Sequence, residues 1–275
     1  MSFGQRLREA MDGRGPLCVG IDPHPALMDQ WGLTDSVFGL EKFAFTAVES
    51  VGSVAAAVKP QSAFFERHGS KGIAVLEKVI EQARGMGAIV VLDVKRGDVG
   101  SSTQAYADAY LDQRSPLAVD AITASPFLGF GSLEPLIETA LANDSGVFVL
   151  ALTSNPEAPQ IQHATVADGR TVAGTILGEI AVRNADAEDM GSIGAVVGTT
   201  IRETTENLDI KGPLLVPGFG AQGGTVGDVS RIFGSAAGNV LPSSSRDILA
   251  AGPDKAKLHA TVEQLAHVFA GLARP

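Results

Sequence analysis

Eight short apolar segments, spread along nearly the whole chain, constrain its fold more than any other feature. They read LCVGID, VAAAVK, AIVVLDVK, VDAITA, GVFVLAL, IGAVVG, GPLLVP and AGNVLP, at residues 17–22, 54–59, 88–95, 119–124, 146–152, 193–198, 212–217 and 237–242. Most of these segments are continuously apolar rather than alternating. Such a pattern is typical of parallel strands that are covered on both faces.

Segments with helical spacing of apolar residues lie between the predicted strands. They cover residues 38–52, 72–86, 101–112, 131–142, 171–188, 201–208, 225–235 and 254–272. Eight strand–helix units in 275 residues predict an α/β fold, the (β/α)8 barrel, and no linker or low-complexity stretch divides the chain. We therefore expect residues 1–275 to form one barrel domain, with its functional site at the carboxyl ends of the strands.

The charge balance narrows the range of partners. The chain has 31 acidic and 21 basic residues and a formal net charge of −10, so its surface repels phosphate backbones and we expect no nucleic-acid partner. The first residues, MSFGQRLREAMDGRG, have no apolar core of the kind that a signal peptide needs, and no apolar run approaches membrane-spanning length. We expect a soluble, cytoplasmic protein that does not bind membranes.

Polar and ionisable residues gather where the predicted strands end. Asp22 closes the first strand, Lys59 the second, and Asp93 with Lys95 the third. Further polar or glycine-rich ends are Thr123, Ser125, Thr153, Ser154, 198–200, 218–224 and 243–246. Since the carboxyl ends of barrel strands meet at one rim, these groups predict an active site there.

The segment VVLDVKRGDVGSS, residues 90–102, places an ammonium between two carboxylates. Asp93 and Lys95 are two apart, so on a strand their side chains point to the same side. Asp98 follows just past the strand, and Lys59 on the neighbouring strand is able to join them. Opposite charges about 4 Å apart interact by roughly 4 kcal/mol at an effective dielectric constant near 20, which keeps both lysines protonated and both aspartates ionised.

A lysine held in its protonated form is a poor nucleophile and a good proton donor. The pattern therefore argues against a Schiff-base aldolase, whose lysine must be neutral, and favours protonation of a carbanion. Carboxylates also bind Mg²⁺, but the charge of Lys95 competes with a cation at this position. A bound metal is therefore the less favoured interpretation of this site.

The segment VPGFGAQGG contains Gly218, Gly220 and Gly223 in a G-x-G-x-x-G arrangement, and Arg246 follows the next strand. A dinucleotide-binding fold requires further βαβ units after such a loop, and here a single helix follows. In barrels, the loops after the seventh and eighth strands often bind phosphate through backbone N–H groups and an arginine. Phosphate binding is the favoured interpretation, and tight turns without a ligand are the alternative.

These motifs resemble those of the orotidine 5′-phosphate decarboxylase family. LDVKRGDVGSS is similar to its Asp-x-Lys-x-x-Asp motif, and VGIDPHP, KPQSAFFERHG, ALTSNPEA, LLVPGFGAQGG and SSSRDIL resemble segments of the longer bacterial subgroup, in the same order. The resemblance spans nearly the whole chain. Asp-x-Lys-x-x-Asp alone also occurs in sugar-phosphate lyases of the same barrel suprafamily.

The resemblance implies cofactor-free decarboxylation of orotidine 5′-monophosphate (OMP) to UMP and CO2, the last step of de novo pyrimidine nucleotide synthesis. It implies that Lys95 protonates C6, that Asp93 lies near the substrate carboxylate, and that Lys59 braces Asp93. The remaining roles that it implies are contacts to ribose by Asp22 and Lys59, to the pyrimidine edge by Ser154, and to phosphate by Gln222, Arg246 and the backbone around Gly220, Gly223 and Gly224. The loop that contains Gln222 is the expected lid.

The resemblance also implies a homodimer with a shared active site. Asp98 is expected to come from the partner subunit, with Ser102 beside it on the ribose. Ser102 stands where the family pattern has Thr, which keeps the hydroxyl. The helix with Gln104, Tyr106 and Tyr110 is expected at the dimer interface.

Two other functions remain open at this stage. One is a Mg²⁺-dependent sugar-phosphate lyase, such as a 3-keto-gulonate 6-phosphate decarboxylase. The other is a barrel that binds phosphate without catalysis, against which the intact set of Asp93, Lys95 and Asp98 argues. We expect His24 to be a solvated loop residue, with a position beside the site as the alternative, and Phe127 to be a packing residue.

Overall fold

The computed structural model describes residues 1–199, 204–219 and 226–271. Within these residues, eight parallel strands form a closed barrel in which each strand pairs with its neighbours in the sequence and β8 pairs with β1. Their bounds are β1 Cys18–Ile21, β2 Ala57–Pro60, β3 Ile89–Arg96, β4 Ala121–Ala124, β5 Gly146–Leu152, β6 Ile193–Val197, β7 Leu214–Pro217 and β8 Val240–Ser244. The predicted (β/α)8 barrel is confirmed.

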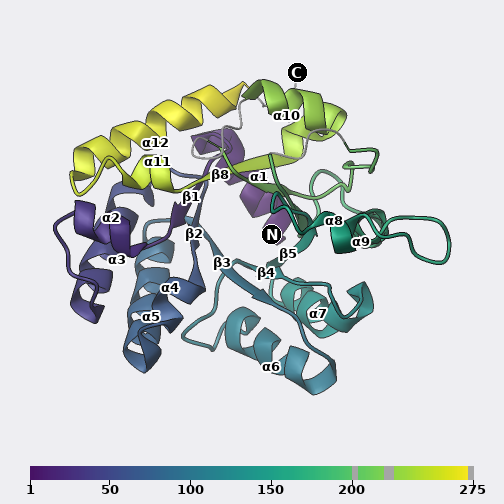
Figure 1. The fold of residues 1–275 in the computed structure, drawn as a ribbon, viewed down its shortest axis with the longest axis horizontal. Helices are drawn as coiled ribbons and strands as arrows, with labels where there is room; N and C mark the ends of the chain where they lie inside the picture. The colour runs from purple at the N-terminus through teal and green to yellow at the C-terminus, as the bar shows by residue number, and fades with distance from the viewer. Residues whose placement is uncertain (200–203, 220–225, 272–275) are drawn as a thin grey trace.

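Helices form a ring around the strands (Figure 1). The α-helices are α1 Phe3–Arg14, α2 Pro25–Gln30, α3 Val37–Val51, α4 Ser62–Glu66, α5 Gly69–Gly85, α6 Gly100–Leu111, α7 Glu134–Ala142, α8 Pro159–Gln162, α9 Val172–Arg183, α10 Val226–Phe233, α11 Arg246–Leu249 and α12 Lys255–Ala270; the 3₁₀ helices are η1 Phe130–Leu133 and η2 Gly234–Asn239. In the part of the chain that the structure describes, no helix is long and apolar enough to cross a membrane.

Two predicted helices differ from the structure. Residues 204–208 are not helical, and the rest of the segment expected at 201–208 includes positions outside the described residues. The helix expected at 171–188 ends at Arg183, because the buried Asn184 leaves the helical pattern. Its amide donates to the carbonyl oxygens of Ile193 and Ile210 at 2.7 and 2.9 Å and so ties the helix end to β6 and to the segment before β7.

Two strands, β2 and β8, begin three residues later than predicted. Residues 54–55 belong to the turn after α3, where the N–H groups of Val54 and Ala55 both donate to the carbonyl oxygen of Val51. Residues 234–239 form η2, so β8 starts at Val240 and runs to Ser244. Ser243 and Ser244 therefore lie inside the last strand, whereas the sequence pattern placed them after it.

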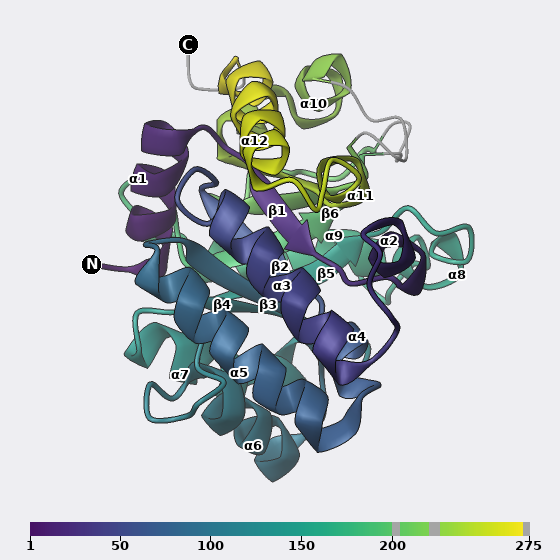
Figure 2. The ribbon, with the colours of Figure 1, turned by 90° about the vertical axis from the view of Figure 1, so that its left-hand side faces the viewer.

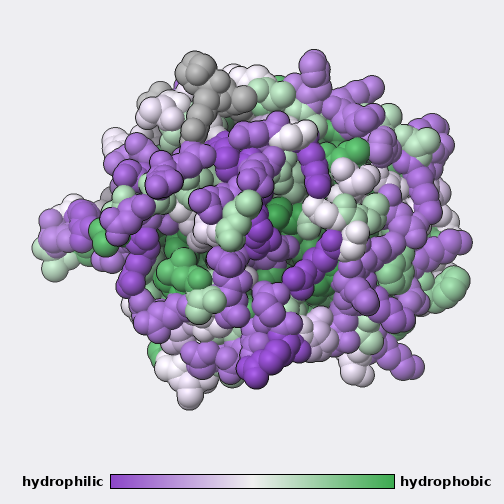
Figure 3. Space-filling view, turned by 180° about the vertical axis from the view of Figure 1, so that it is seen from behind, coloured by the Kyte–Doolittle hydropathy of each residue, from purple (hydrophilic) through white to green (hydrophobic). Residues whose placement is uncertain are grey.

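The amino-terminal helix α1, which the apolar pattern did not predict, closes one end of the barrel. Ser2 and Gln5 form a reciprocal capping box that starts the helix. Its buried face presents Phe3, Leu7 and Met11 to the barrel interior, where Phe3 meets the ring of Phe148 edge-on. Figure 2 shows α1 at one end of the barrel, with α2 and α8 at the other, and Figure 3 shows a largely hydrophilic face at the α1 end.

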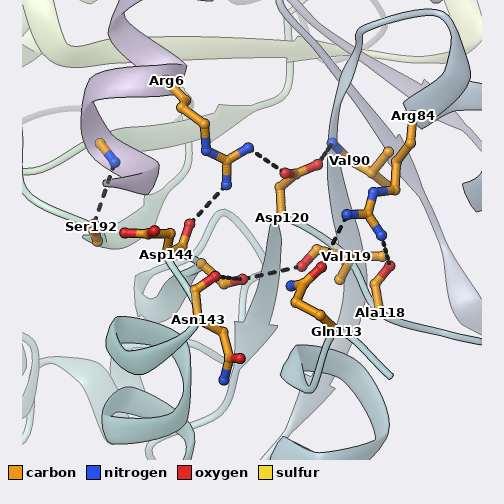
Figure 4. Close-up of polar contacts among 12 residues, drawn as sticks. Arg6, Arg84, Val90, Gln113, Ala118, Val119, Asp120, Asn143, Asp144 and Ser192 are labelled. Carbon is orange, nitrogen blue, oxygen red and sulfur yellow. Dashed lines mark hydrogen bonds and ion pairs between the residues drawn. The ribbon is translucent and has the colours of Figure 1, made fainter. Parts of the chain in front are cut away.

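A buried carboxylate at the start of β4 fastens α1 to the strands (Figure 4). Arg6 Nη1 donates to Asp120 Oδ1 at 2.5 Å, and the backbone N–H of Val90 on β3 donates to Asp120 Oδ2 at 2.9 Å. Arg6 Nη2 also donates to the carbonyl oxygen of Asp144, just before β5. One arginine thereby links the helix to three neighbouring strands, and the opposite end of the barrel is left open for the site.

Candidate active site

Asp93 on β3 is the centre of the polar groups at the carboxyl ends of the strands. Lys59 Nζ donates to its Oδ2 at 2.8 Å, and Lys95 Nζ donates to its Oδ1 at 2.5 Å. Thr123 Oγ1, from β4, donates to Oδ1 at 2.8 Å. The predicted contacts of Lys59 and Lys95 with Asp93 are present, and the carboxylate is held by donors from three consecutive strands.

Burial and charge together fix the ionisation of this pair. Burial alone raises the pKa of Asp93, but the ammonium groups of Lys59 and Lys95 outweigh it and hold that pKa well below its ordinary value. Burial alone lowers the pKa of Lys59, but the carboxylates of Asp93 and Asp22 raise it above its ordinary value. Both groups are therefore charged at neutral pH, as the sequence predicted.

Lys95 has an unusual backbone conformation. Its φ is 44°, in the left-handed region that side chains other than glycine rarely adopt, and the pairing of β3 with β4 shifts register between Leu92 and Arg96. Its N–H donates to Thr123 Oγ1 at 2.9 Å, which holds the strained residue in place. The irregularity gives the ammonium a half-exposed position, with 46 % of the side chain accessible, beside a carboxylate that is only 9 % accessible.

A cavity of about 390 Å³, which we call the charged cavity, opens beside these groups. Its walls come from β2 to β7 and the loop after β5: Lys59, Asp93, Lys95, Thr123, Leu150, Thr153, Ser154, Asn155, Gln162, Val196, Leu215 and Pro217. Most of its surface is apolar and the ionised groups are confined to one side, which is typical of a site for a small organic molecule.

A second cavity, of about 170 Å³, shares Lys59 and Pro217 with the first, and we call it the arginine cavity. Its remaining walls are Asp22, His24, Gly218, Phe219, Ser243, Ser245 and Arg246. Within the described residues, Asp22 Oδ1 and Ser245 Oγ are buried without a hydrogen-bond partner. Buried polar atoms of this kind indicate a place for a polar ligand. His24 was expected in solvent, but it lines this cavity and packs on Phe64.

Ser154 lies in the loop after β5, on the wall of the charged cavity. The loop returns to its own start because Gln162, at the end of α8, binds Thr153 twice. Thr153 N–H donates to Gln162 Oε1 at 2.8 Å, and Gln162 Nε2 donates to Thr153 Oγ1 at 2.8 Å. Ser154 therefore belongs to a loop whose two ends are joined by hydrogen bonds.

Among the described residues, no ion pair joins Asp98 to Lys59 or Lys95, whose ammonium groups both bind Asp93. Asp98 Oδ1 accepts a hydrogen bond from the N–H of Val99 at 2.8 Å. Ser102 lies on the exposed side of the first turn of α6. In the described part of the chain, the predicted contacts that form are those of Lys59 and Lys95 with Asp93, and the roles of Asp98 and Ser102 toward a partner subunit stay predictions.

Three predicted phosphate-binding glycines and the predicted lid residue lie outside the described residues. They are Gly220, Gly223, Gly224 and Gln222. Arg246, at the start of α11, is described and lines the arginine cavity. The observed part of the predicted phosphate site is therefore Arg246 with the end of β7.

Sequence reasoning missed three residues that organise the site. Thr123 was noted as a strand end but not as a partner of Asp93, and the inward-facing register of β4 was the available signal. Arg96 donates to Glu66 Oε1 at 2.5 Å and lies over the ring of Tyr106, which ties the residue after Lys95 to α4 and α6. Gln162 is the third, and no spacing in the sequence relates it to Thr153.

No group of three or more His, Cys, Asp or Glu side chains is arranged to hold a metal ion in residues 1–199, 204–219 and 226–271. Both oxygens of Asp93 already accept hydrogen bonds from lysines. The chemistry that this arrangement favours is the stabilisation and protonation of a carbanion next to Lys95.

Comparisons with known proteins agree with this geometry. The model of the orotidine 5′-phosphate decarboxylase / HUMPS family matches residues 15–261. An orotidine 5′-phosphate decarboxylase of a Nocardioides species is 63 % identical over 90 % of this chain and 91 % of its own length. The corresponding protein of Streptomyces coelicolor is 53 % identical, over 96 % of this chain and 95 % of its own.

A crystal structure from Streptomyces avermitilis, whose protein carries the provisional name of orotidine 5′-phosphate decarboxylase, has the same fold as this chain. The two superpose with a TM-score of 0.96 at 53 % identity, over 98 % of this chain and 95 % of the other. The barrel and its helices are therefore shared along nearly their full length.

Proposed function

Because the chain belongs to the orotidine 5′-phosphate decarboxylase / HUMPS family, we propose that it decarboxylates OMP to UMP and CO2, the last step of de novo pyrimidine nucleotide synthesis. We propose that the reaction needs neither a metal nor an organic cofactor. The observation that carries the proposal is the position of Lys95, whose Nζ is bonded to Asp93 and whose side chain is half exposed at the charged cavity.

In the proposed reaction, the pyrimidine of OMP occupies the charged cavity with its carboxylate near Asp93. The bond between C6 and the carboxylate carbon breaks, CO2 leaves, and the electron pair stays on C6. Lys95 donates a proton to C6 and becomes neutral. Repulsion between the substrate carboxylate and Asp93 disappears as CO2 departs, while attraction between Lys95 and the developing carbanion grows, and both changes lower the barrier.

Lys59 and Thr123 support this step by holding Asp93 in place. Lys59 is buried and stays charged, so it keeps Asp93 ionised after Lys95 has lost its proton. We assign Asp22 and Lys59 to the ribose hydroxyls and Arg246 to the phosphate. The unpartnered Asp22 Oδ1 and the presence of Arg246 in the same cavity favour these roles.

The test is the loss of OMP absorbance with purified protein in excess EDTA, alongside Lys95→Ala. Rapid turnover by the wild type and a fall of about 10³-fold or more in the variant are expected, since a positioned acid and its electrostatic field contribute at least that much. No turnover by the wild type contradicts the proposal. Activity that appears only with added Mg²⁺ on sugar phosphates identifies the rival lyase.

We further propose that the whole chain is one barrel domain that acts in the cytoplasm as a homodimer with a shared active site. Three exposed apolar side chains lie on the adjacent loops after β3 and β4: Val99 is 58 % exposed, Phe127 73 % and Leu128 53 %. The two loops are joined by a hydrogen bond from Ser125 N–H to the Arg96 carbonyl oxygen. Phe127 was expected to pack inside the chain, and its exposure instead favours burial against a second subunit.

Mixing two inactive variants tests the shared site. If Asp98 of one subunit serves Lys95 of the other, a heterodimer of Lys95→Ala and Asp98→Ala contains one intact site. An equal mixture that is allowed to exchange subunits should then recover about a quarter of the wild-type activity. A mixture that stays inactive although exchange is demonstrated, or a fully active monomer in analytical ultracentrifugation, contradicts the proposal.

In the first turn of α6, Ser102→Ala should raise KM more than it lowers kcat.

A further inference from the structure

The loop after β5 contains a continuous chain of side-chain hydrogen bonds, which we call the amide relay. Gln162 Nε2 donates to Thr153 Oγ1 at 2.8 Å, and Thr153 Oγ1 donates to Asn155 Oδ1 at 2.7 Å. Asn155 Nδ2 then donates to Glu157 Oε2 at 3.0 Å. At the Gln162 end of the amide relay, the backbone N–H of Thr153 donates a further hydrogen bond to Gln162 Oε1 at 2.8 Å.

The two ends of the amide relay allow only one orientation of its members. The ionised carboxylate of Glu157 accepts and cannot donate, so Asn155 must turn its NH2 group toward it and its oxygen toward Thr153. The single hydroxyl proton of Thr153 is used on Asn155, so Thr153 must accept from Gln162. The oxygen of Gln162 then faces the backbone N–H of Thr153, which can only donate.

The amide relay encloses Ser154, the residue between Thr153 and Asn155. Thr153, Ser154, Asn155 and Gln162 all line the charged cavity, on whose wall Lys95 also lies. A serine hydroxyl both donates and accepts, so alone it does not distinguish a base edge with a carbonyl and an N–H from one with an amino group and a bare nitrogen. Discrimination requires that the backbone and side chain around Ser154 keep a fixed orientation.

We propose that the amide relay is a specificity device: Gln162, Asn155 and Glu157 position Ser154 so that the site prefers a pyrimidine with a 4-carbonyl and an N3–H over its 4-amino analogue. These residues act through Ser154 and are positioning residues. The inference deepens the proposed function and rests on it, since it assigns the pyrimidine edge to this wall of the charged cavity. The proposal also gives a reason why the side-chain amide of Gln162 makes two hydrogen bonds to Thr153, at the start of an exposed loop.

The experiment measures dissociation constants of UMP, CMP and ribose 5-phosphate by calorimetry, for the wild type and for Gln162→Ala, Glu157→Gln and Gln160→Ala. Removal of the Gln162 amide should lower the preference for UMP over CMP by about tenfold or more, because the hydrogen bond that Ser154 makes to the base is then misaligned. Binding of ribose 5-phosphate should stay within about twofold, because it depends on the arginine cavity.

Glu157→Gln is the second variant, because it changes an exposed residue and leaves the fold intact. An amide at this position can donate as well as accept, so Asn155 loses its single orientation, and the preference should fall by about threefold. Gln160→Ala is the matched control, because Gln160 lies on the same short helix α8 as Gln162 and is not a member of the amide relay. Its UMP-to-CMP ratio should equal that of the wild type.

The outcomes separate the two proposals. If the wild type converts OMP but Gln162→Ala and Glu157→Gln keep the wild-type ratio, the inference is wrong and the proposed function stands. If ribose 5-phosphate binding weakens as much as UMP binding, the amide relay is only structural and the inference is also wrong. If the wild type neither converts OMP nor distinguishes UMP from CMP, both proposals fail together.

Discussion

The two ends of the barrel each hold one buried aspartate, on neighbouring strands, and they use it differently. Asp93 at the carboxyl end of β3 is 6 % exposed, and Asp120 just before β4 is 7 % exposed. Both accept hydrogen bonds on both carboxylate oxygens, and both pair with cations from another element. Burial and charge pairing alone therefore do not distinguish the candidate active site from a structural contact.

The partners of the two aspartates make the difference. Asp120 binds the guanidinium of Arg6 and a backbone N–H, and α1 covers it (Figure 4). An arginine stays charged and its planar group suits a fixed geometry, so this contact fastens elements together. Asp93 binds two lysines beside a cavity, and one of them is half exposed. A lysine can donate a proton to a substrate. At the end of the barrel where a cavity takes the place of the covering helix, a lysine–aspartate pair can therefore take part in a reaction.

The largest expected effect is on activity, and it should separate the two ends. Asp93→Asn should lower kcat by about 10³-fold, because an amide cannot hold two ammonium groups or repel the substrate carboxylate. Asp120→Asn should leave kcat per folded molecule within about twofold, since its partners only position α1. OMP absorbance assays, corrected for the folded fraction by circular dichroism, measure both. Equal losses of kcat in Asp93→Asn and Asp120→Asn would contradict the distinction between a catalytic and a structural aspartate.

The second expected effect is on the free energy of unfolding, which a substitution at Asp120 should lower more than a substitution at the active end. Asp120→Ala leaves the Val90 N–H without its acceptor and the Arg6 guanidinium without its ion pair, so the free energy of unfolding should fall by about 2–4 kcal/mol. Lys95→Ala removes a half-exposed side chain and should change it by less than about 1 kcal/mol. Urea unfolding followed by fluorescence of Trp31 and by circular dichroism gives both values. A Lys95 variant less stable than the Asp120 variant contradicts the comparison.

The smallest effect is on the pH dependence of stability at the Asp93 end. The pKa of Asp93 is lowered in the folded state from an ordinary value of 3.8, so its stabilisation is present above that pH and is lost as the pH falls toward the lowered pKa. The pKa of Lys59 is raised from 10.5, so its stabilisation is present below that pH and is lost as the pH rises toward the raised value.

Thermal unfolding between pH 2 and pH 5 tests this prediction. The melting temperature of the wild type should fall toward that of Asp93→Asn, because acid in this range protonates Asp93 in the unfolded chain while the folded chain still holds it ionised, and this proton uptake favours unfolding. Arg6→Lys, at the other end of the barrel, keeps Asp93 and serves as the control, so its curve should run parallel to the wild type. A constant difference between the wild type and Asp93→Asn across this range would show that Asp93 does not gain stability from its charge.

Much of the active end was predictable because parallel strands bring their carboxyl ends to one rim. Lys59 and Asp93 are 34 positions apart, yet both close apolar runs, and their hydrogen bond follows from strand order. The end of α9 was mispredicted because Asn184 bonds to distant segments that apolar spacing does not record. The start of β8 was mispredicted because residues 234–239 form the helix η2. The shift at Lys95 also lay beyond reach, since it depends on how β3 meets β4.

The amino-acid sequence alone predicted the barrel, the rim on which the site lies and the charged group of Lys59, Asp93 and Lys95. These features follow from the alternation of apolar strands with amphipathic helices, which repeats along the chain and needs no knowledge of individual contacts. The closure of the other end by α1, the left-handed conformation of Lys95 and the hold of Gln162 on the loop around Ser154 became evident only in the folded chain. Each of these depends on side chains from separate elements meeting in space, and the loops that bring them together have no periodicity to predict their path.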